Sequence, residues 1–303
     1  MPDGRLPASP RKDDALLLGA VAYDAKVVAI WEGFRRVFEA RGLPFDFVLF
    51  SNYERQVEAL FDGFVHVAWN SPLAWIESDR LARARGRSAS AIAMRDTDRD
   101  LTSVIIVRVE GGGPQDRITG VGDLRGRRVA VGAADSPQAT LIPLLQLVEA
   151  GLEPGTDFEV QRHDLLLGKH GDHIGGERDA VRALLAGRAD AACVLDASLL
   201  AFGQEGTLPP GATRVLHQTP PYDHCNFTVL DGAPAALVDR FLGLLLSMSY
   251  DDPEVRSLMD QEGLKAWRPG RLSGYAQLDR AATRLRAIDG WLDRMGANRP
   301  ASR

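Results

Sequence analysis

The sequence of 303 residues contains few cysteines and no long run of apolar residues. Its two cysteines, Cys193 and Cys225, exclude a disulfide framework and any thiol-rich metal spacing such as CxxC. The longest apolar stretches are too short to cross a bilayer, so we expect no membrane span. Positive charge is not in excess either, since the formal net charge is −5. We therefore expect no nucleic-acid partner, because nucleic-acid binders carry a concentrated basic face.

The composition is otherwise that of a globular protein, with 45% hydrophobic and 25% charged residues. A chain of this length can form two domains, each with a core of its own. Arginine is abundant but alternates with acidic residues, as in RDTDRD at residues 95–100. This alternation predicts a solvated surface segment.

The start of the chain imitates a secretory signal. An apolar run at residues 15–22 ends in Ala-Val-Ala at 20–22, which resembles a cleavage site. Asp13 and Asp14 directly precede this run, however, and cleavage would remove the first predicted core strand. We therefore interpret residues 1–14 as a flexible tail. The expected location is cytoplasmic, with a periplasmic or extracytoplasmic location as the alternative.

Short apolar segments alternate with amphipathic helical patterns along most of the chain, which is typical of α/β folds. The predicted strands are residues 16–22, 45–50, 65–69, 88–93, 102–109, 128–131, 158–162 and 189–195. The predicted helices are residues 26–40, 53–62, 72–85, 138–150 and 178–185, with further helical sequence from Pro234 onward.

Part of this pattern occurs twice in the same order. Residues 57–69 can be aligned with residues 181–193, since each is a helix ended by Gly and followed by a turn and a buried strand. Residues 38–47 resemble residues 148–158 in the same way. The repetition predicts two similar α/β lobes.

The lobes are expected to be joined by a two-segment hinge. We assign residues 15–97 plus 218–303 to lobe 1, which is discontinuous, and residues 98–217 to lobe 2. Open α/β sheets bind ligands at the carboxyl ends of their strands. A ligand cleft between the lobes is therefore predicted.

Polar residues that follow the predicted strands are the candidates for ligand binding, because they suit a small polar solute. They are Tyr23, Asp24, Tyr53, Asn70, Ser71, Ser136, Gln138, Thr140, Asp196, Tyr222 and Asn226. Trp69 stands at a strand end and is either a wall of the pocket or part of the core.

The turn from Gly132 to Thr140 joins a strand to a helix. Backbone N–H groups in the first turn of a helix are unpaired, and the helix dipole there favours an anion. The hydroxyls of Ser136 and Thr140 can bind the oxygens of phosphate, phosphonate or carboxylate. Ser136 also reads as a helix N-cap with Pro137 at the first helical position, and the two roles are compatible.

Three motifs resemble the phosphate/phosphite/phosphonate-binding family, the solute receptors of ABC importers. They are DLRGRRVAV at 123–131 followed by Asp135-Ser136, VHVAWNSPLAW at 65–75, and His173 placed four residues before Glu177. The resemblance extends over residues 16–249 and implies a type 2 periplasmic-binding-protein fold. It also implies hinge closure on a small anionic solute (phosphonate-, phosphate-ester- or carboxylate-like), an ABC permease as partner, and no cofactor.

Carried over residue by residue, the resemblance implies that the Ser136–Thr140 turn and His173 contact the anionic group. It also implies that Tyr23 and Trp69 flank the ligand. The sequence departs from the family at Pro137, where members usually offer another hydroxyl. It departs again in the long, His-rich loop at residues 167–176.

An enzyme on the same fold, acting in small-molecule or cofactor metabolism, is the alternative function. Its candidate catalytic residues are Cys225, His224 and His173. Adjacent residues of an extended strand point to opposite faces, so we expect His224 not to reach Cys225 directly. Buried cysteine is more often a small apolar core residue, which is also the role expected for Cys193.

His170 and His173 are the candidate metal ligands, three residues apart in a Gly-rich loop. The spacing alone gives weak geometry, and no thiolate pair or HExxH motif supports it. We therefore expect no bound metal.

Overall fold

The computed structural model describes residues 14–109, 118–164 and 174–297. The chain forms two compact units, with residues up to 99, 223–273 and 290 onward in unit 1, and residues 100–222 and 274–289 in unit 2. The predicted tail lies outside the described residues, apart from Asp14.

The sequence pattern placed all of residues 218–303 in lobe 1, whereas residues 274–289 belong to unit 2. The reason is that α9 (Ala276–Arg284) packs against α4 (Ile142–Glu149), where Gln146 Nε2 donates to Gln277 Oε1 over 3.0 Å. The chain therefore passes between the units at residues 99–100, 222–223, 273–274 and 289–290, not only through the two predicted segments.

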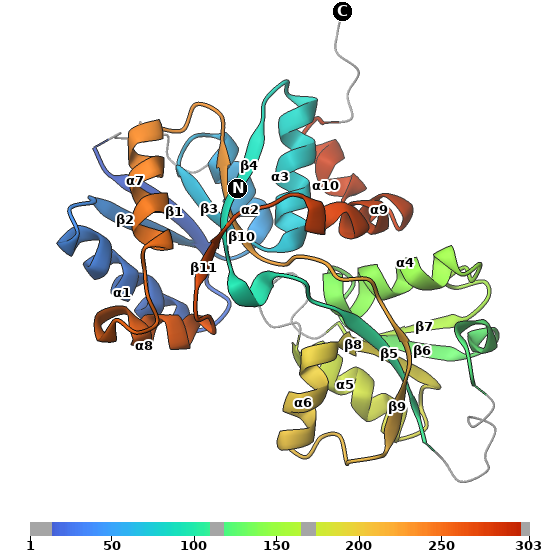
Figure 1. The fold of residues 1–303 in the computed structure, drawn as a ribbon. Coiled ribbons are helices and arrows are strands. Elements are labelled where there is room, and N and C mark those ends of the chain that lie inside the picture. Colours follow the sequence, from blue (N-terminus) through green and yellow to red (C-terminus); the bar gives the residue numbers. More distant parts are fainter. Residues whose placement is uncertain (1–13, 110–117, 165–173, 298–303) are drawn as a thin grey trace, which may run out of the picture. The chain divides into compact units, whose positions relative to one another are not determined.

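Unit 1 is built on a six-stranded sheet with the order β11-β4-β10-β3-β1-β2. Its strands are β1 (Leu16–Val21), β2 (Phe45–Phe50), β3 (Val67–Asn70), β4 (Ala89–Arg95), β10 (Asn226–Leu230) and β11 (Trp267–Pro269). Its helices are α1 (Lys26–Ala40), α2 (Tyr53–Phe61), α3 (Pro72–Ala84), α7 (Ala235–Leu246), α8 (Pro253–Glu262), α10 (Asp289–Arg294) and the short turn η1 (Asp96–Asp98). Figure 1 shows α1, α7 and α8 on one face of this sheet and α2 and α3 on the other.

The predicted first strand is confirmed as a core strand. β1 pairs in parallel with β2 on one side and with β3 on the other. Leu16 and Leu18 are completely buried and pack with aromatic residues of α1 and α7, among them Phe38 and Phe241. Burial of such side chains contributes roughly 1.5–3 kcal/mol each.

Unit 2 contains a five-stranded sheet with the order β7-β6-β8-β5-β9. Its strands are β5 (Ser103–Arg108), β6 (Arg128–Val131), β7 (Glu159–Arg162), β8 (Ala191–Leu195) and β9 (Thr213–Gln218). Its helices, besides α4 and α9, are α5 (Ile174–Leu185), α6 (Asp196–Gln204), the turn η3 (Val121–Leu124) and the π-helical turn η4 (Pro137–Leu141), while η5 (Ser273–Tyr275) lies at the boundary of the units.

The alternation of side chains along β5 explains why both faces of the second sheet are covered. Val104 and Ile106 point to the core beneath α5 and α6, whereas Ile105 and Val107 point to the core beneath α4. Cys193 on β8 joins the α4 core with no exposed surface, as predicted.

The two predicted lobes are similar in the way their helices end. Gly63 after α2 and Gly187 after α5 both have a left-handed backbone conformation, with φ of 71° and 73°. Glycine adopts this conformation without the steric cost that a Cβ atom brings. The aligned segments at 57–69 and 181–193 thus share the same helix, turn and buried strand.

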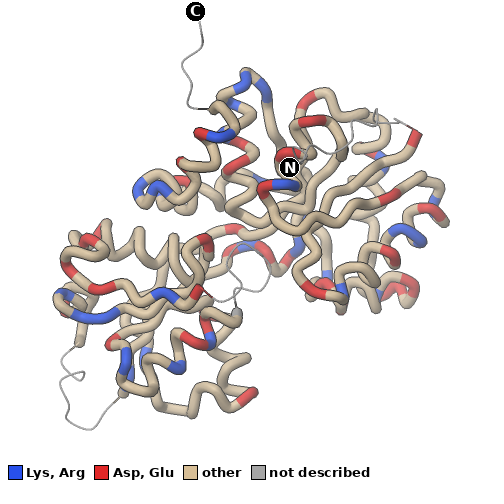
Figure 2. Tube along the Cα trace, turned by 180° about the vertical axis from the view of Figure 1, so that it is seen from behind, with Lys and Arg blue, Asp and Glu red and all other residues tan. Residues whose placement is uncertain are grey.

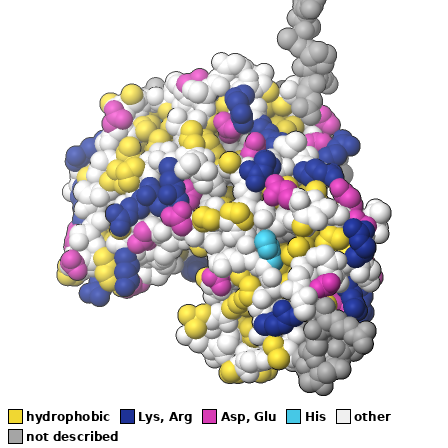
Figure 3. Space-filling view, turned by 45° about the vertical axis from the view of Figure 1, so that its right-hand side comes forward, with side chains coloured by type: hydrophobic (Ala, Val, Ile, Leu, Met, Phe, Trp, Pro, Cys, Tyr) yellow, Lys and Arg dark blue, Asp and Glu magenta, His cyan; other side chains and the backbone are white. Residues whose placement is uncertain are grey.

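Charged residues of both signs are interspersed over each unit (Figures 2 and 3). The large hydrophobic side chains that are exposed belong to different elements, for example Val28 on α1 and Leu200 on α6. Every helix within the described ranges is too short or too polar to span a membrane.

Candidate functional site

The topology of unit 1 gathers functional side chains at one edge of its sheet. Strands β1, β2 and β3 are parallel, and β10 is antiparallel to β3. The beginning of β10 therefore lies at the same edge as the ends of the other strands. Tyr23, Tyr53 and Cys225 meet there, and each tyrosine interacts electrostatically with Cys225.

Burial and the nearby Glu262 carboxylate raise the pKa of Tyr23 to about 12. Burial also raises the pKa of Tyr53, which is only 6% exposed. Both phenols therefore keep their protons at neutral pH, and each hydroxyl has a hydrogen to donate. Of the two, Tyr23 is the more exposed.

Beside the tyrosines, His224, Cys225 and Asp98 form a compact cluster. His224 Nδ1 lies 3.1 Å from Cys225 Sγ and 3.5 Å from Asp98 Oδ1. The prediction that His224 cannot reach Cys225 is wrong. Strict alternation of side chains holds only within a strand, and β10 begins at Asn226, after both residues.

The prediction that residues 95–100 form a solvated surface segment is also wrong for its central acid. Asp98 is 2% exposed and binds Arg95 in a bidentate pair, with Nε–Oδ2 and Nη2–Oδ1 distances of 2.6 and 2.9 Å. Burial alone raises the pKa of Asp98, but the contacts with Arg95 and His224 outweigh burial and lower this pKa to about 2. Arg95 also contacts Glu262 and lies over the ring of Trp69, 5.3 Å from its centroid.

Several predicted binding residues of unit 1 take up positions in its interior. Trp69 belongs to the core, 6% exposed, and packs against Phe227 at a centroid distance of 4.5 Å. Asn70 is completely buried, accepts from Gln56 Nε2 and donates to Thr228 Oγ1, which in turn donates to Asn226 Oδ1. These asparagines face each other across β3 and β10 and hold the two strands together.

Two further predicted residues stand at helix N-termini. Ser71 caps α3 by accepting from the Ala74 N–H over 3.2 Å. Asp24 is exposed and accepts from the Lys26 N–H at the start of α1, over 2.8 Å. Each therefore satisfies a backbone donor that the helix itself leaves unpaired.

Unit 2 also gathers polar residues at one edge of its sheet. Strands β6, β7 and β8 are parallel and β5 is antiparallel to β8, so the beginning of β5 lies beside the ends of the other three. The Gly132–Thr140 turn follows β6 there. Ser136 is the N-cap of η4, accepting from the Ala139 N–H over 3.2 Å, as predicted.

The helix predicted over residues 138–150 starts instead with the π-helical turn η4, and its cause is Pro143. Proline has no N–H, so the carbonyl of Ala139 cannot receive the usual bond from four residues on. This carbonyl accepts from the Gly132 N–H instead, over 3.2 Å. The turn is thereby tied to the end of β6.

A buried network fixes the side chain of Gln138 within this turn. Ser103 Oγ donates to the Gln138 carbonyl over 2.6 Å and lies 2.7 Å from the hydroxyl of Tyr222. Gln138 Nε2 donates to Glu177 Oε1 over 3.2 Å. Because a carboxylate oxygen only accepts, this bond assigns the amide orientation, and Gln138 Oε1 points away from Glu177.

Two buried polar atoms of the turn have no hydrogen-bond partner among the described residues. They are Thr140 Oγ1 and Gln138 Oε1, on side chains that are 2% and 6% exposed. Leaving such a group unsatisfied costs about 1–3 kcal/mol. An unsatisfied buried hydroxyl and amide oxygen at a strand-to-helix turn indicate a site that a ligand completes.

The remaining predicted residues are distributed as follows. Asp196 is exposed at the start of α6, and Tyr222 is 1% exposed, with its pKa raised by burial. His170 and His173 lie outside the described residues. Sequence reasoning missed Glu177 as part of the site. The available signal was its place in the third family motif, four residues after His173.

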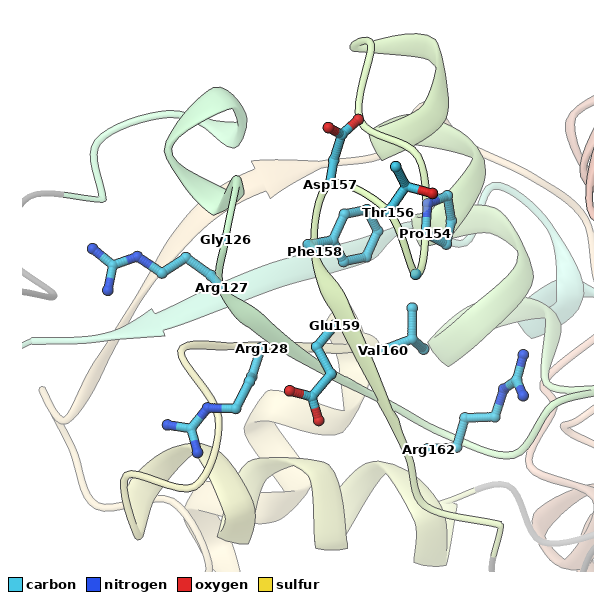
Figure 4. A pocket seen from close by; sticks show the side chains of 11 residues that line it. Gly126, Arg127, Arg128, Pro154, Thr156, Asp157, Phe158, Glu159, Val160 and Arg162 are labelled. Carbon is cyan, nitrogen blue, oxygen red and sulfur yellow. The ribbon is translucent and has the colours of Figure 1, made fainter.

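A separate concavity lies around β7 on unit 2 (Figure 4). Three arginines line it, but Arg127 and Arg162 point away from each other, and Arg128 donates to the Gly187 carbonyl beside Asp190. Diverging cations do not form a convergent anion site. The Ser136–Thr140 turn therefore remains the candidate site of unit 2.

Two α/β units, each with polar side chains at the carboxyl edge of its sheet, define the class of type 2 periplasmic-binding-protein folds. PhnD1 from Prochlorococcus marinus, solved with methylphosphonate, is similar at TM-score 0.66 and 14% identity, covering 91% of this chain and 99% of that chain. XAC2383 from Xanthomonas citri, solved with ATP, is similar at TM-score 0.67 and 17% identity, covering 90% of this chain and 98% of that chain. The periplasmic aliphatic sulphonate binding protein SsuA from Escherichia coli is similar at TM-score 0.53 and 19% identity, covering 94% of each chain.

The chain belongs to the family described as ABC transporter, phosphonate, periplasmic substrate-binding protein, whose model matches residues 21–275. This confirms the resemblance and favours solute binding over the enzyme alternative. The family implies a small anionic ligand and partnership with an ABC permease. The cytoplasmic location expected above finds no support in this family, whose description is periplasmic.

Proposed function

We propose that this protein captures a small phosphorus oxyanion, of the phosphonate, phosphite or phosphate class, for an ABC importer. The oxyanion binds at the Ser136–Thr140 turn of unit 2. The single observation that carries this proposal is the pair of buried, unpartnered atoms, Thr140 Oγ1 and Gln138 Oε1, at the turn that bears the family motif.

The two atoms differ in what they require of a ligand. The Thr140 hydroxyl can donate to an anionic oxygen, whereas the Gln138 amide oxygen can only accept. A ligand that satisfies both must present an acceptor and a donor side by side. A singly protonated phosphonate does so through its P–O⁻ and P–OH groups. A sulfonate has no such proton at neutral pH, so it leaves Gln138 Oε1 unsatisfied.

The Ser103–Tyr222 pair supports the site from behind. It holds the Gln138 carbonyl through a chain of buried hydroxyls, so the turn is positioned before the ligand arrives. Such preorganisation reduces the ordering cost of binding. Tyr23 and Asp24 of unit 1 stay as proposed ligand contacts, and the predicted cleft between the lobes stays a prediction.

The test is calorimetric titration with methylphosphonate, phosphite, inorganic phosphate and methanesulfonate, with choline as a cationic control. We expect one saturable site per chain for at least one phosphorus oxyanion. We also expect methanesulfonate to bind at least roughly tenfold more weakly, since one buried acceptor stays unpaired. Equal affinity for the sulfonate would contradict the role of Gln138. No binding of any phosphorus oxyanion would refute the proposal itself.

The same proposal places the protein outside the cytoplasmic membrane with an ABC permease as its docking partner, as the family description indicates. Fractionation of host cells followed by immunoblotting tests the location. Recovery of the protein only with cytoplasmic markers would contradict it.

A further inference from the structure

The His224, Cys225 and Asp98 cluster of unit 1 has no role in the proposed oxyanion site of unit 2. Asp98 fixes both of its neighbours, because its carbonyl accepts from the His224 N–H over 2.8 Å and its Oδ1 accepts from the Cys225 N–H over 3.3 Å. The imidazole is thereby held against the sulfur, at 3.1 Å between Nδ1 and Sγ. This is a built arrangement of three side chains.

The charges around the cluster favour an anionic sulfur. The bidentate contact with Arg95 already neutralises Asp98, and the sulfur of Cys225 lies 3.1 Å from the His224 imidazole. Burial alone lowers the pKa of His224, but Cys225 and Asp98 outweigh burial and raise it to about 10. His224 is therefore protonated at neutral pH, and its imidazolium lies directly against the sulfur of Cys225.

A metal ion fits the same cluster poorly. Its three ligand atoms lie within 4.8 Å of one another, which is compact enough for coordination. However, Arg95 occupies both oxygens of Asp98, so a divalent cation would meet a guanidinium at close range. The same guanidinium stabilises negative charge on the sulfur.

We propose that Cys225 is a reactive thiol which small electrophiles and hydroperoxides modify, with His224 as its charge and proton partner. With hydrogen peroxide, the sulfur attacks one oxygen, an S–O bond forms and the O–O bond breaks. The departing hydroxide takes the proton from the His224 imidazolium and leaves as water, so Cys225 becomes a sulfenic acid and His224 neutral.

The chain provides an internal comparison for this site, since both of its cysteines are free. Cys225 is 7% exposed and the side chain of His224 is 22% exposed, so a small reagent can approach the sulfur. Cys193 has no exposed surface, and burial raises its pKa to about 12. Cys193 is therefore expected to stay inert in the folded protein.

The pH dependence of the reaction reflects all groups that surround the sulfur. The charged and titratable groups that interact with Cys225 or its partner His224 are Tyr23, Tyr53, Arg95, Asp98 and His224, and Glu262 interacts in turn with Tyr23, Tyr53 and Arg95. Of these, His224 makes the direct contact with Sγ.

The test is alkylation of the full chain with iodoacetamide between pH 6.5 and 8.5, followed by peptide mapping of both cysteines. The Cys225 sulfur displaces iodide and gains one carbamidomethyl group. An ordinary thiol accelerates roughly 50-fold over this range, because its pKa is about 8.5. We expect the Cys225 rate to change less than about threefold and Cys193 to stay unlabelled until the protein is denatured.

His224→Asn keeps a hydrogen-bonding side chain but removes the charge. We expect this variant to slow alkylation at pH 6.5 at least tenfold and to restore the steep pH dependence. The comparison of Cys225 with Cys193 in the natural chain needs no variant, so it remains decisive if His224→Asn folds poorly. Equal labelling of the two cysteines, an ordinary pH profile at Cys225, or one zinc per chain that blocks labelling until EDTA is added would overturn the proposal. None of these outcomes depends on oxyanion binding.

Discussion

Thr140→Val separates ligand binding from folding at the proposed oxyanion site. Valine keeps the shape of threonine and replaces the buried Oγ1, which has no hydrogen-bond partner among the described residues, with a methyl group. In the unliganded protein this removes a desolvation cost of about 1–3 kcal/mol. We therefore expect the free energy of unfolding of unit 2 to stay equal or to rise.

In the complex, the same substitution removes a hydrogen bond to a charged ligand. Such a bond contributes about 1.5–3 kcal/mol, so the dissociation constant for methylphosphonate should rise roughly 10- to 150-fold. A hydroxyl with a merely structural role gives the reverse pattern, with lower stability and unchanged affinity.

Affinity is measured by calorimetric titration, and stability by hydrogen exchange of β6 and α4 peptides in urea. Tryptophan fluorescence does not suit the second measurement, because all five tryptophans lie in unit 1. Thr283→Val is the matched control, since this exposed hydroxyl donates to the Asp279 carbonyl within α9. Loss of more than about 1 kcal/mol of stability in Thr140→Val, together with wild-type affinity, would refute the reasoning.

Three further predictions concern the scaffold. Gly33→Ala should destabilise unit 1 in urea by about 1–3 kcal/mol, because the new Cβ would lie 2.2 Å from Leu258 Cδ2. The control is Gly243→Ala, which has no atom near its new Cβ and should gain up to about 1 kcal/mol of stability. Equal effects of the two substitutions would contradict this packing. The pKa of Asp98 is depressed from 3.8 to about 2, so its stabilisation of roughly 2 kcal/mol is present above pH 4 and lost as the pH falls toward 2. Urea titrations at pH 5 and 2.5 should show this loss in the natural chain and not in Asp98→Asn, and an identical acid response in both would exclude Asp98 as its source. Tyr222→Phe removes the hydroxyl group that contacts Ser103 Oγ. We expect it to weaken methylphosphonate binding several-fold and to lower stability by about 1 kcal/mol. Unchanged affinity would show that the network does not position the turn.

Local patterns in the sequence carried enough information for most elements of the fold. The helix over residues 26–40 and the strands over 45–50 and 128–131 were predicted with the observed limits, because each has a clear period of apolar residues between turn residues. The duplicated helix ends were recognisable because Gly63 and Gly187 need a left-handed backbone. Secondary structure of this kind depends on neighbours in the sequence.

The features that escaped prediction depend on distant residues. Asp98 is buried because Arg95 and the Cys225 backbone bind it, and Cys225 lies 127 residues away. A charged segment viewed alone therefore reads as surface. Asn70 became a structural residue because it pairs with Thr228 on β10, 158 residues away. Such partners become visible only when the strand order is known.

The turn after β6 was predicted as a site, but not its conformation. Its π-helical geometry arises because Pro143 frees the Ala139 carbonyl, which then binds Gly132. Likewise, the contact between His224 and Cys225 depends on where β10 begins, within a single residue. Boundaries of elements are the least predictable feature of a sequence, and chemistry at a boundary shares that uncertainty.

The most direct test of the central claim is native mass spectrometry of the protein purified from its own host, before and after denaturation. We predict the added mass of one small phosphorus-containing anion per chain, which denaturation releases and phosphorus NMR identifies. A protein that carries no such anion, and that takes up none of methylphosphonate, phosphite or phosphate at millimolar concentration, would contradict the account.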